Sequence, residues 1–407
     1  MLKKPKNVPP KSPTRLIRNA SPDYRRAMET MDAEAFGAEA TEQVGRFLAH
    51  RDDHAPTPLV ELPNLARELG IGAIHIKDEG QRLGLGSFKA LGGAYAVIRL
   101  AVESASQTLG RPVDIAQWRI PEVAEVAAGM TIVCATDGNH GRSVAQGAQL
   151  VGAQCVVFVH TGVSEARSKA IARFGAQIVR IEGDYDDSVA EASRAAEANG
   201  WIVVSDTSWL GYERIPRLVM QGYNALLQEA LAEMPAPPTH VFIQAGVGGI
   251  AAAVAAHLAL VFGSNRPFLT VVEPTRAACL FESAKACRPI KIARGRSTLM
   301  AMLECYEPSR VAWRILSRAA DAFMTVEEED AVAVMKRLAF PLGGDPVLVA
   351  GESGGVGLAG LTKVANDPTL RREIGLGSDA RVFLINTEGA TDPALYETLV
   401  GAAPERI

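Results

Sequence analysis

Short apolar runs alternate along this chain of 407 residues with segments whose apolar residues recur at helical spacing. Strands that alternate with helices are typical of βαβ units, so the chain is predicted to be an α/β protein with a mostly parallel sheet and helices on both faces. In such sheets ligands bind beyond the carboxyl ends of the strands, so function is to be sought in the loops that follow them. The predicted strands are residues 73–76, 131–135, 155–159, 177–181, 202–205, 241–245, 269–272 and 381–386.

The composition excludes several classes of protein. With 48% hydrophobic and 22% charged residues the chain is typical of a globular protein, and at about 150 residues per domain its length predicts two or three domains. Its 42 Lys and Arg against 46 Asp and Glu leave a net charge of −4, which provides no broad basic surface for nucleic acid or anionic lipid. The five cysteines form no C-x-x-C pair, as is typical of a reducing compartment, so we expect a cytoplasmic protein with buried thiols.

Residues 241–263 are long and apolar enough to resemble a membrane span. However, glycines at positions 246, 248 and 249 divide this stretch into a strand-like half and a helix-like half, so we expect a buried strand followed by a helix. The basic, proline-rich residues 1–19 have no apolar core of the kind found in signal peptides and are predicted to form a flexible tail. No membrane partner is expected.

The first loop that carries chemistry is residues 84–94, where Lys89 follows a turn rich in Gly and Ser. A helix is predicted over residues 89–102, which places Lys89 in its first turn. The positive end of a helix disfavours an ammonium group, so the pKa of this lysine is expected to be lowered and its amine to be nucleophilic, as a Schiff base requires. The alternative is a solvated surface lysine.

The second loop, residues 136–143, follows the strand predicted at 131–135. Small and polar residues at a helix N-terminus offer N–H groups to an anion such as a carboxylate, and Asn139 could donate a hydrogen bond to a ligand oxygen. Asp137 would repel a bound carboxylate, so an acid or base role is the functional interpretation, and a helix N-cap is the alternative. A single histidine such as His140 is more often a structural, hydrogen-bonded residue than a catalytic one.

The third and fourth loops follow the strands predicted at 241–245 and 381–386. A glycine cluster between a buried strand and a helix allows the backbone to approach a phosphate, and the missing G-x-G-x-x-G spacing favours a single phosphate over a dinucleotide. Thr387 is expected at the carboxyl edge of the sheet. The glycine cluster is Gly246, Val247, Gly248, Gly249 and Ile250.

Taken in this order, the four loops resemble the fold-type II pyridoxal-5′-phosphate (PLP) enzymes, the tryptophan synthase β family, over most of residues 55 to 395. The resemblance implies two open, mostly parallel sheets flanked by helices, with the active site in the cleft between two domains. It implies PLP as cofactor and no metal. By the same resemblance PLP is held by Lys89, Phe88, Asn139 at the 3′ oxygen, the glycine cluster at the phosphate and Thr387 at the ring nitrogen.

Within this family, the motifs Phe-Lys-x-Leu-Gly-Gly at 88–93 and Thr-Asp-Gly-Asn-His at 136–140 resemble those of the diaminopropionate ammonia-lyases. Leu91 and Asp137 stand where threonine dehydratases typically have an arginine and a small residue. The implied reaction is elimination from 2,3-diaminopropionate, in both D and L forms, to pyruvate and two ammonia. Lys89 and Asp137 are expected to be the bases on opposite faces of Cα, and Asp206 to place or deprotonate the substrate amino group. Further substrate contacts are expected from Thr136, Gly138 and His140, and a minor lining role from residues 352–355.

Two other functions stay open at this point: a serine or threonine dehydratase on the same fold, and a dinucleotide-dependent oxidoreductase that uses the glycine cluster. The family pattern also implies a homodimer that binds a small amino-acid substrate. The predicted organisation is an N-terminal tail and leading helix at 1–50, a large PLP-binding domain at 51–91 and 206–407, and a smaller inserted domain at 92–205.

Overall fold

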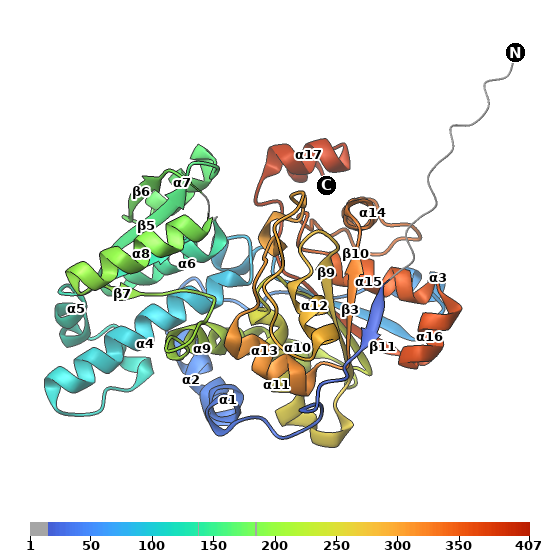
Figure 1. Ribbon diagram of the computed structural model, residues 1–407, viewed down its shortest axis with the longest axis horizontal. Helices are drawn as coiled ribbons and strands as arrows, with labels where there is room; N and C mark the ends of the chain where they lie inside the picture. Colours follow the sequence, from blue (N-terminus) through green and yellow to red (C-terminus); the bar gives the residue numbers. More distant parts are fainter. Residues whose placement is uncertain (1–14, 137, 184) are drawn as a thin grey trace, which may run out of the picture.

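The computed structural model describes residues 15–136, 138–183 and 185–407, so Asp137 lies outside the described residues. These residues form two open sheets that lie side by side in Figure 1, the smaller one on the left. The larger sheet has seven strands in the order β1-β10-β9-β8-β11-β3-β2, and the smaller has four in the order β6-β5-β4-β7. Neighbouring strands are parallel except at the two edges of the larger sheet, where β1 and β2 are antiparallel to their partners. The predicted α/β class is confirmed.

Each predicted strand is present, and the structure adds β1, β2 and β10. The strands β1 and β2 are only three residues long, too short for a clear alternating pattern. The larger sheet consists of β1 (Leu16–Arg18), β10 (Ala322–Val326), β9 (Phe268–Pro274), β8 (His240–Gln244), β11 (Arg381–Asn386), β3 (Ala73–Asp78) and β2 (Leu59–Glu61). The smaller sheet consists of β6 (Gln177–Ile181), β5 (Gln154–His160), β4 (Thr131–Ala135) and β7 (Ile202–Val203).

Helices cover both sheets, as the alternating pattern predicts (Figure 1). The helices before β8 are α1 (Thr30–Phe36), α2 (Ala38–Ala49), α3 (Pro63–Glu68), α4 (Lys89–Leu109), α5 (Pro121–Ala127), α6 (Asn139–Val151), α7 (Glu165–Ala172), α8 (Tyr185–Asn199), α9 (Arg214–Gly222) and α10 (Asn224–Glu233). Those after it are α11 (Gly249–Phe262), α12 (Cys279–Ala286), α13 (Arg310–Ala319), α14 (Glu328–Ala339), α15 (Val356–Ala365), α16 (Pro368–Ile374) and α17 (Pro393–Val400).

The apolar stretch 241–263 divides as predicted, into the buried strand β8 and the helix α11 with glycines between them. Every residue of β8 is buried, because layers of helices cover both faces of a parallel sheet. This burial explains why the strand reads as an apolar run. Among the described residues no helix combines the length and the apolar character that crossing a membrane requires.

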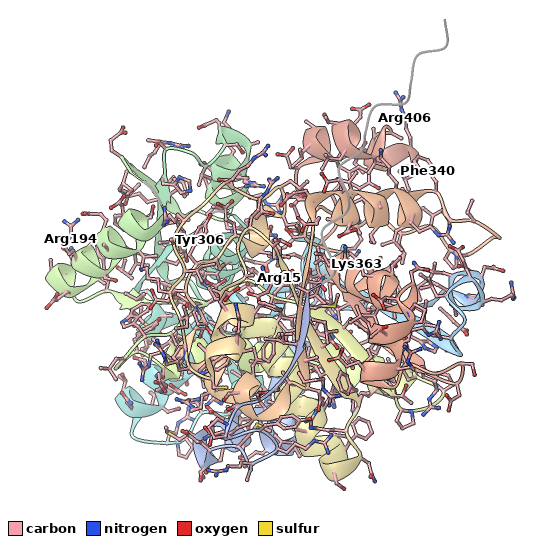
Figure 2. The ribbon with its side chains drawn as sticks, turned by 45° about the vertical axis from the view of Figure 1, so that its right-hand side comes forward. Arg15, Arg194, Tyr306, Phe340, Lys363 and Arg406 are labelled. Atoms are coloured by element: carbon pink, nitrogen blue, oxygen red, sulfur yellow. The ribbon has the colours of Figure 1, made fainter. Side chains whose placement is uncertain are left out.

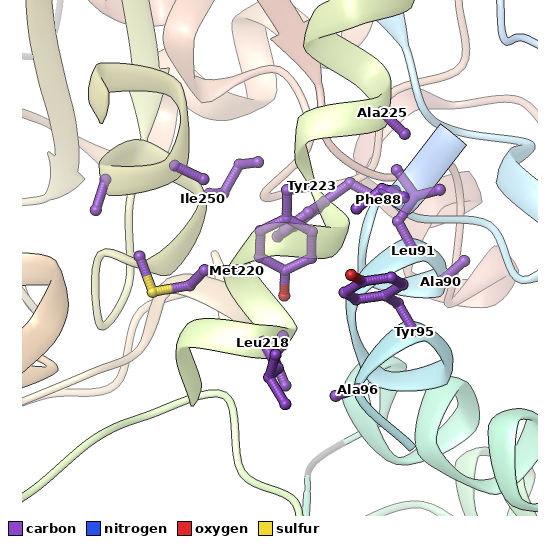
Figure 3. Close-up of a cluster of buried hydrophobic side chains, with 14 of the residues drawn as sticks. Phe88, Ala90, Leu91, Tyr95, Ala96, Leu218, Met220, Tyr223, Ala225 and Ile250 are labelled. Atoms are coloured by element: carbon purple, nitrogen blue, oxygen red, sulfur yellow. The ribbon is translucent and has the colours of Figure 1, made fainter. Parts of the chain in front are cut away.

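The helices α4 and α9 cross at two glycines that let their backbones approach. A Cβ added to Gly92 would lie 2.6 Å from the Val219 carbonyl oxygen, and one added to Gly222 would lie 2.7 Å from that of Leu91. The same crossing packs Phe88 against Tyr223 edge to face, with ring centroids 4.8 Å apart (Figure 3). This contact holds the first turn of α4, and with it Lys89, against α9.

We therefore expect Gly92→Ala to destabilise the protein by about 2 kcal/mol or more, because backbone atoms would have to separate. The midpoint of thermal unfolding is the measurement. Gly45→Ala in α2 is the matched control, since its Cβ would meet only the Gln228 side chain at 3.7 Å. There, alanine is expected to stabilise the helix by about 0.5–1 kcal/mol. Equal midpoints for the two variants would contradict the close crossing.

Candidate active site

A cavity opens where the carboxyl ends of strands from both sheets meet. The loops after β4, β8 and β11 line it, together with the start of α4 and the residue Asp206 that follows β7. The structure thus gathers the sequence-predicted site residues in one place, apart from Asp137, which lies outside the described residues. Those that line the cavity are Phe88, Lys89, Thr136, Gly138, Asn139, His140, Asp206, Gly246, Val247, Gly248, Gly249, Ile250 and Thr387.

Lys89 is the first residue of α4, and its Nζ donates a hydrogen bond to Asp206 Oδ2 over 3.0 Å. Burial by itself lowers the pKa of Lys89, but the charge of Asp206 and this hydrogen bond outweigh it, so the pKa is raised. Burial likewise opposes the charge on Asp206, yet the ammonium holds the pKa of Asp206 far below its usual range. The predicted lowering of the Lys89 pKa is therefore wrong for this arrangement, because the neighbouring carboxylate dominates over the helix end.

Thr136, directly after β4, binds two backbone N–H groups at the start of α6. Its Oγ1 accepts hydrogen bonds from the backbone N–H of Gly138 at 3.0 Å and of Gly141 at 3.1 Å. His140 is buried, and its Nε2 lies 2.9 Å from the Val204 carbonyl oxygen, which can only accept, so the ring donates from Nε2. Burial lowers the pKa of His140, so the ring is neutral at physiological pH. His140 therefore donates to the backbone of Val204 and also lines the cavity.

The glycine cluster forms a cradle of backbone groups. Gly248 has φ = +99°, a left-handed conformation that favours glycine, and it precedes the first residue of α11. A Cβ added to Gly246 would lie 2.8 Å from Cys305 Sγ, so a side chain would crowd this wall of the cavity. The first-turn N–H groups of a helix have no intrahelical acceptor, so the cradle is suited to a phosphate.

Gln244, at the end of β8, orients the hydroxyl of Thr387. Its Nε2 donates to Thr387 Oγ1 over 2.9 Å, and its Oε1 accepts from the Gly357 N–H over 3.1 Å, which fixes the orientation of the amide. Because Thr387 Oγ1 already accepts from Gln244, its own proton is free to donate to a neutral acceptor such as a pyridine nitrogen. Sequence analysis missed Gln244, although a glutamine at the end of a fully buried strand was a usable signal.

Glu388 is a second residue that sequence analysis missed. It lines the cavity, and its Oε2 accepts a hydrogen bond from Asn139 Nδ2 over 2.8 Å. Burial and the nearby Glu352 raise the pKa of Glu388 to about 8. An acidic residue directly after the apolar strand 381–386 was the available signal.

A second cavity adjoins the first, with Val247, Met302 and Glu304 lining both. Tyr306, labelled in Figure 2, lines the outer cavity and donates from its hydroxyl to Glu304 Oε1 over 2.5 Å. Arg167, Lys291 and Arg294 line this outer cavity together with Glu304 and Glu307, so side chains of both charges surround it.

Comparison with known proteins decides the family. The profile of the pyridoxal-phosphate dependent enzymes matches residues 50–388. The chain belongs to this family. Diaminopropionate ammonia-lyase of Escherichia coli K12 is 38% identical over 354 residues, covering 85% of this chain and 87% of the relative. The E. coli enzyme in complex with an aminoacrylate-PLP azomethine reaction intermediate has a TM-score of 0.84 at 35% identity, covering 95% and 96% of the chains. Its complex with D-serine gives the same TM-score, 0.84, at 34% identity and the same coverage.

Membership of the pyridoxal-phosphate dependent enzymes confirms the predicted cofactor and the fold-type II architecture. The cavity fits PLP on its own chemistry. Lys89 offers a partly buried amine, and the first-turn N–H groups of α11 suit the phosphate. The Thr387 hydroxyl accepts from Gln244 and can donate its own proton to a ring nitrogen. A dinucleotide-dependent oxidoreductase, the alternative from another class, does not belong to this family.

Proposed function

We propose that the chain is a diaminopropionate ammonia-lyase that eliminates ammonia from 2,3-diaminopropionate and releases pyruvate and two ammonia. The observation that carries the proposal is the ionised carboxylate of Asp206 within the cavity, in contact with Lys89. A substrate with a second ammonium group needs such a partner, whereas the hydroxyl of serine or threonine does not. The similarity to the E. coli enzyme along most of the chain supports the same substrate.

When bound, PLP accepts the electron pair that the Cα–H bond leaves and so acidifies the Cα proton. Lys89 takes this proton on one face of Cα, and Asp137 is the proposed base on the other. Asp206 keeps the β-nitrogen protonated, so that the Cβ–N bond breaks with its electron pair on nitrogen and neutral ammonia leaves. The pair from the Cα–H bond forms the Cα=Cβ bond. Water then hydrolyses the released enamine to pyruvate and the second ammonia.

The other cavity residues would bind and orient the cofactor and the substrate. Backbone N–H groups of Gly246 to Ile250 would hold the phosphate of PLP, and Asn139 its 3′ oxygen. Thr387 would donate to a ring nitrogen that stays unprotonated, which moderates carbanion stabilisation and suits an elimination. Phe88 packs beside Lys89, and the loop from Thr136 to His140 would bind the substrate carboxylate.

Asp137→Asn tests the second base. Turnover of D-2,3-diaminopropionate is expected to fall about 100-fold or more, because the proposed base on that face is lost. Turnover of the L isomer, which relies on Lys89, is expected to stay within about threefold, an internal control for folding and cofactor loading. Pyruvate release from each isomer is the measurement. An equal loss on both isomers would contradict the two-base arrangement.

The function itself is tested by substrate preference. Pyruvate release by the PLP-loaded protein is measured with D- and L-2,3-diaminopropionate and with L-serine, and 2-oxobutyrate release with L-threonine. Faster turnover of both diaminopropionate isomers is expected. If the hydroxy amino acids were clearly better substrates, the protein would be a dehydratase on the same scaffold.

We also propose a cytoplasmic homodimer with a smaller domain near residues 92–205. The four strands of the smaller sheet all lie between residues 131 and 203, which supports these limits. We further propose that movement of the smaller domain closes the cavity between the two sheets.

A further inference from the structure

The hydrogen bond between Asn139 and Glu388 joins the two sheet layers across the cavity. Asn139 begins α6, which packs on the smaller sheet, and Glu388 follows β11 of the larger sheet. The bond is 2.8 Å long, and the two side chains are only 7% and 2% exposed. A bond so well shielded from water fixes which way the Asn139 amide faces.

The main chain at Glu388 is hydrogen-bonded to the loop that precedes Lys89. Ser87 and Glu388 form an isolated antiparallel bridge, and the Gly389 N–H donates to the Gly86 carbonyl oxygen over 3.0 Å. On its other side the Glu388 carbonyl oxygen accepts from the Gly351 N–H, also over 3.0 Å. The main chain of Glu388 is therefore held between the lysine loop and the 351–354 turn, and its side chain lines the cavity.

The second oxygen of this carboxyl, Oε1, is buried and has no hydrogen-bond partner among the described residues. Glu352, itself 2% exposed, likewise has a buried Oε1 that no described group pairs. Two buried carboxyls with unpaired oxygens are both difficult to ionise, since each charge would lack solvent and would repel the other.

The charged groups that face Glu388 come from three further elements. Burial and Glu352 raise the pKa of Glu388 to about 8, against the opposing effects of the Asn139 hydrogen bond, of Arg167 on α7 and of Lys89 on α4. Burial also raises the pKa of Glu352, which Arg167 opposes and Asp392 reinforces. At neutral pH Glu388 is therefore uncharged and still accepts from Asn139.

We propose that Glu388 is a positioning residue of the cofactor site, whose carboxyl group holds the Asn139 amide in the orientation that binds the anionic cofactor. The inference rests on the proposed function for the place of Asn139 beside PLP. Above the pH at which Glu388 ionises, its carboxylate would repel the phosphate and the 3′ oxygen of PLP, so cofactor affinity falls.

The test is the dissociation constant of PLP between pH 7 and 9, measured by equilibrium dialysis together with the visible absorbance of the holoenzyme and without substrate. The wild-type constant is expected to rise about tenfold over this range. Glu388→Gln keeps an acceptor for Asn139 but cannot ionise. Its dissociation constant for PLP is therefore expected to lie within about threefold of the wild-type value at pH 7 and to stay unchanged up to pH 9. Glu388→Ala is expected to bind about tenfold more weakly at pH 7, with a shifted absorbance maximum.

Glu273→Gln is the matched control. Burial raises the pKa of Glu273 to about 8 as well, but its carboxylate accepts from the Leu280 and Phe281 N–H groups at the start of α12 and does not line the cavity. This variant is expected to lose thermal stability and to keep the pH profile of wild-type PLP binding. The proposal would be overturned if the dissociation constant of Glu388→Gln rose between pH 7 and 9 as in wild type. It would also be overturned if Glu388→Ala bound PLP with wild-type affinity. Because no substrate is used, absence of diaminopropionate turnover would leave this measurement intact.

Discussion

Lys89→Ala is expected to abolish the covalent attachment of PLP and to lower turnover of diaminopropionate by about 10⁴-fold or more, since the amine is both the point of attachment and a base. Visible absorbance after exhaustive dialysis measures attachment, and pyruvate release measures turnover. Lys89→Arg is the matched variant, because it keeps a cation beside Asp206 but provides no amine nucleophile.

Both variants are expected to fold, since Lys89 contributes one ion pair to a cavity wall that Phe88 and Tyr223 hold in place. Lys169→Ala, at an exposed position on α7, controls for the loss of any lysine. A dialysis-resistant visible band in Lys89→Ala would show that another residue carries the cofactor.

Asp206→Asn is expected to lower kcat/KM for diaminopropionate by about 100-fold or more, because an amide cannot replace an ionised partner for the second ammonium group. The loss with L-serine is expected to be much smaller. Equal losses with both substrates would show that Asp206 supports the cavity without recognising that group.

Asp206→Asn is also expected to change the pKa of Lys89. Asp206 is what raises the pKa of Lys89 against the effect of burial, so without it burial dominates and the pKa falls. Attachment of PLP needs the unprotonated amine of Lys89, so the rate at which the cofactor-free protein takes up PLP rises as pH passes through this pKa. The acidic limb of the rate profile is therefore expected to move to lower pH in Asp206→Asn, and an unmoved limb would contradict the role of the pair.

The loops of the site could be predicted because buried parallel strands read as apolar runs, and glycines mark where each run ends. The strands at 131–135, 241–245 and 381–386 were each followed by the residues that meet in the cavity. The helix that starts at Lys89 and the helix after the glycine cluster were predicted for the same reason.

Other features depend on contacts between distant segments and left little trace in the local pattern. The raised pKa of Lys89 depends on Asp206, which lies 117 positions away, and the orientation of Thr387 depends on Gln244, 143 positions away. Glu388 acquires its partner from a residue 249 positions earlier. The edge strands β1 and β2 exist because they pair with longer strands and not because of their own sequence.

The most direct test of the proposed function is the product stoichiometry with each isomer of 2,3-diaminopropionate. Pyruvate and ammonia are quantified after complete consumption by the PLP-loaded protein. One pyruvate and two ammonia per molecule are predicted for both the D and the L isomer. Consumption without pyruvate, or turnover confined to hydroxy amino acids, would contradict the proposed ammonia-lyase.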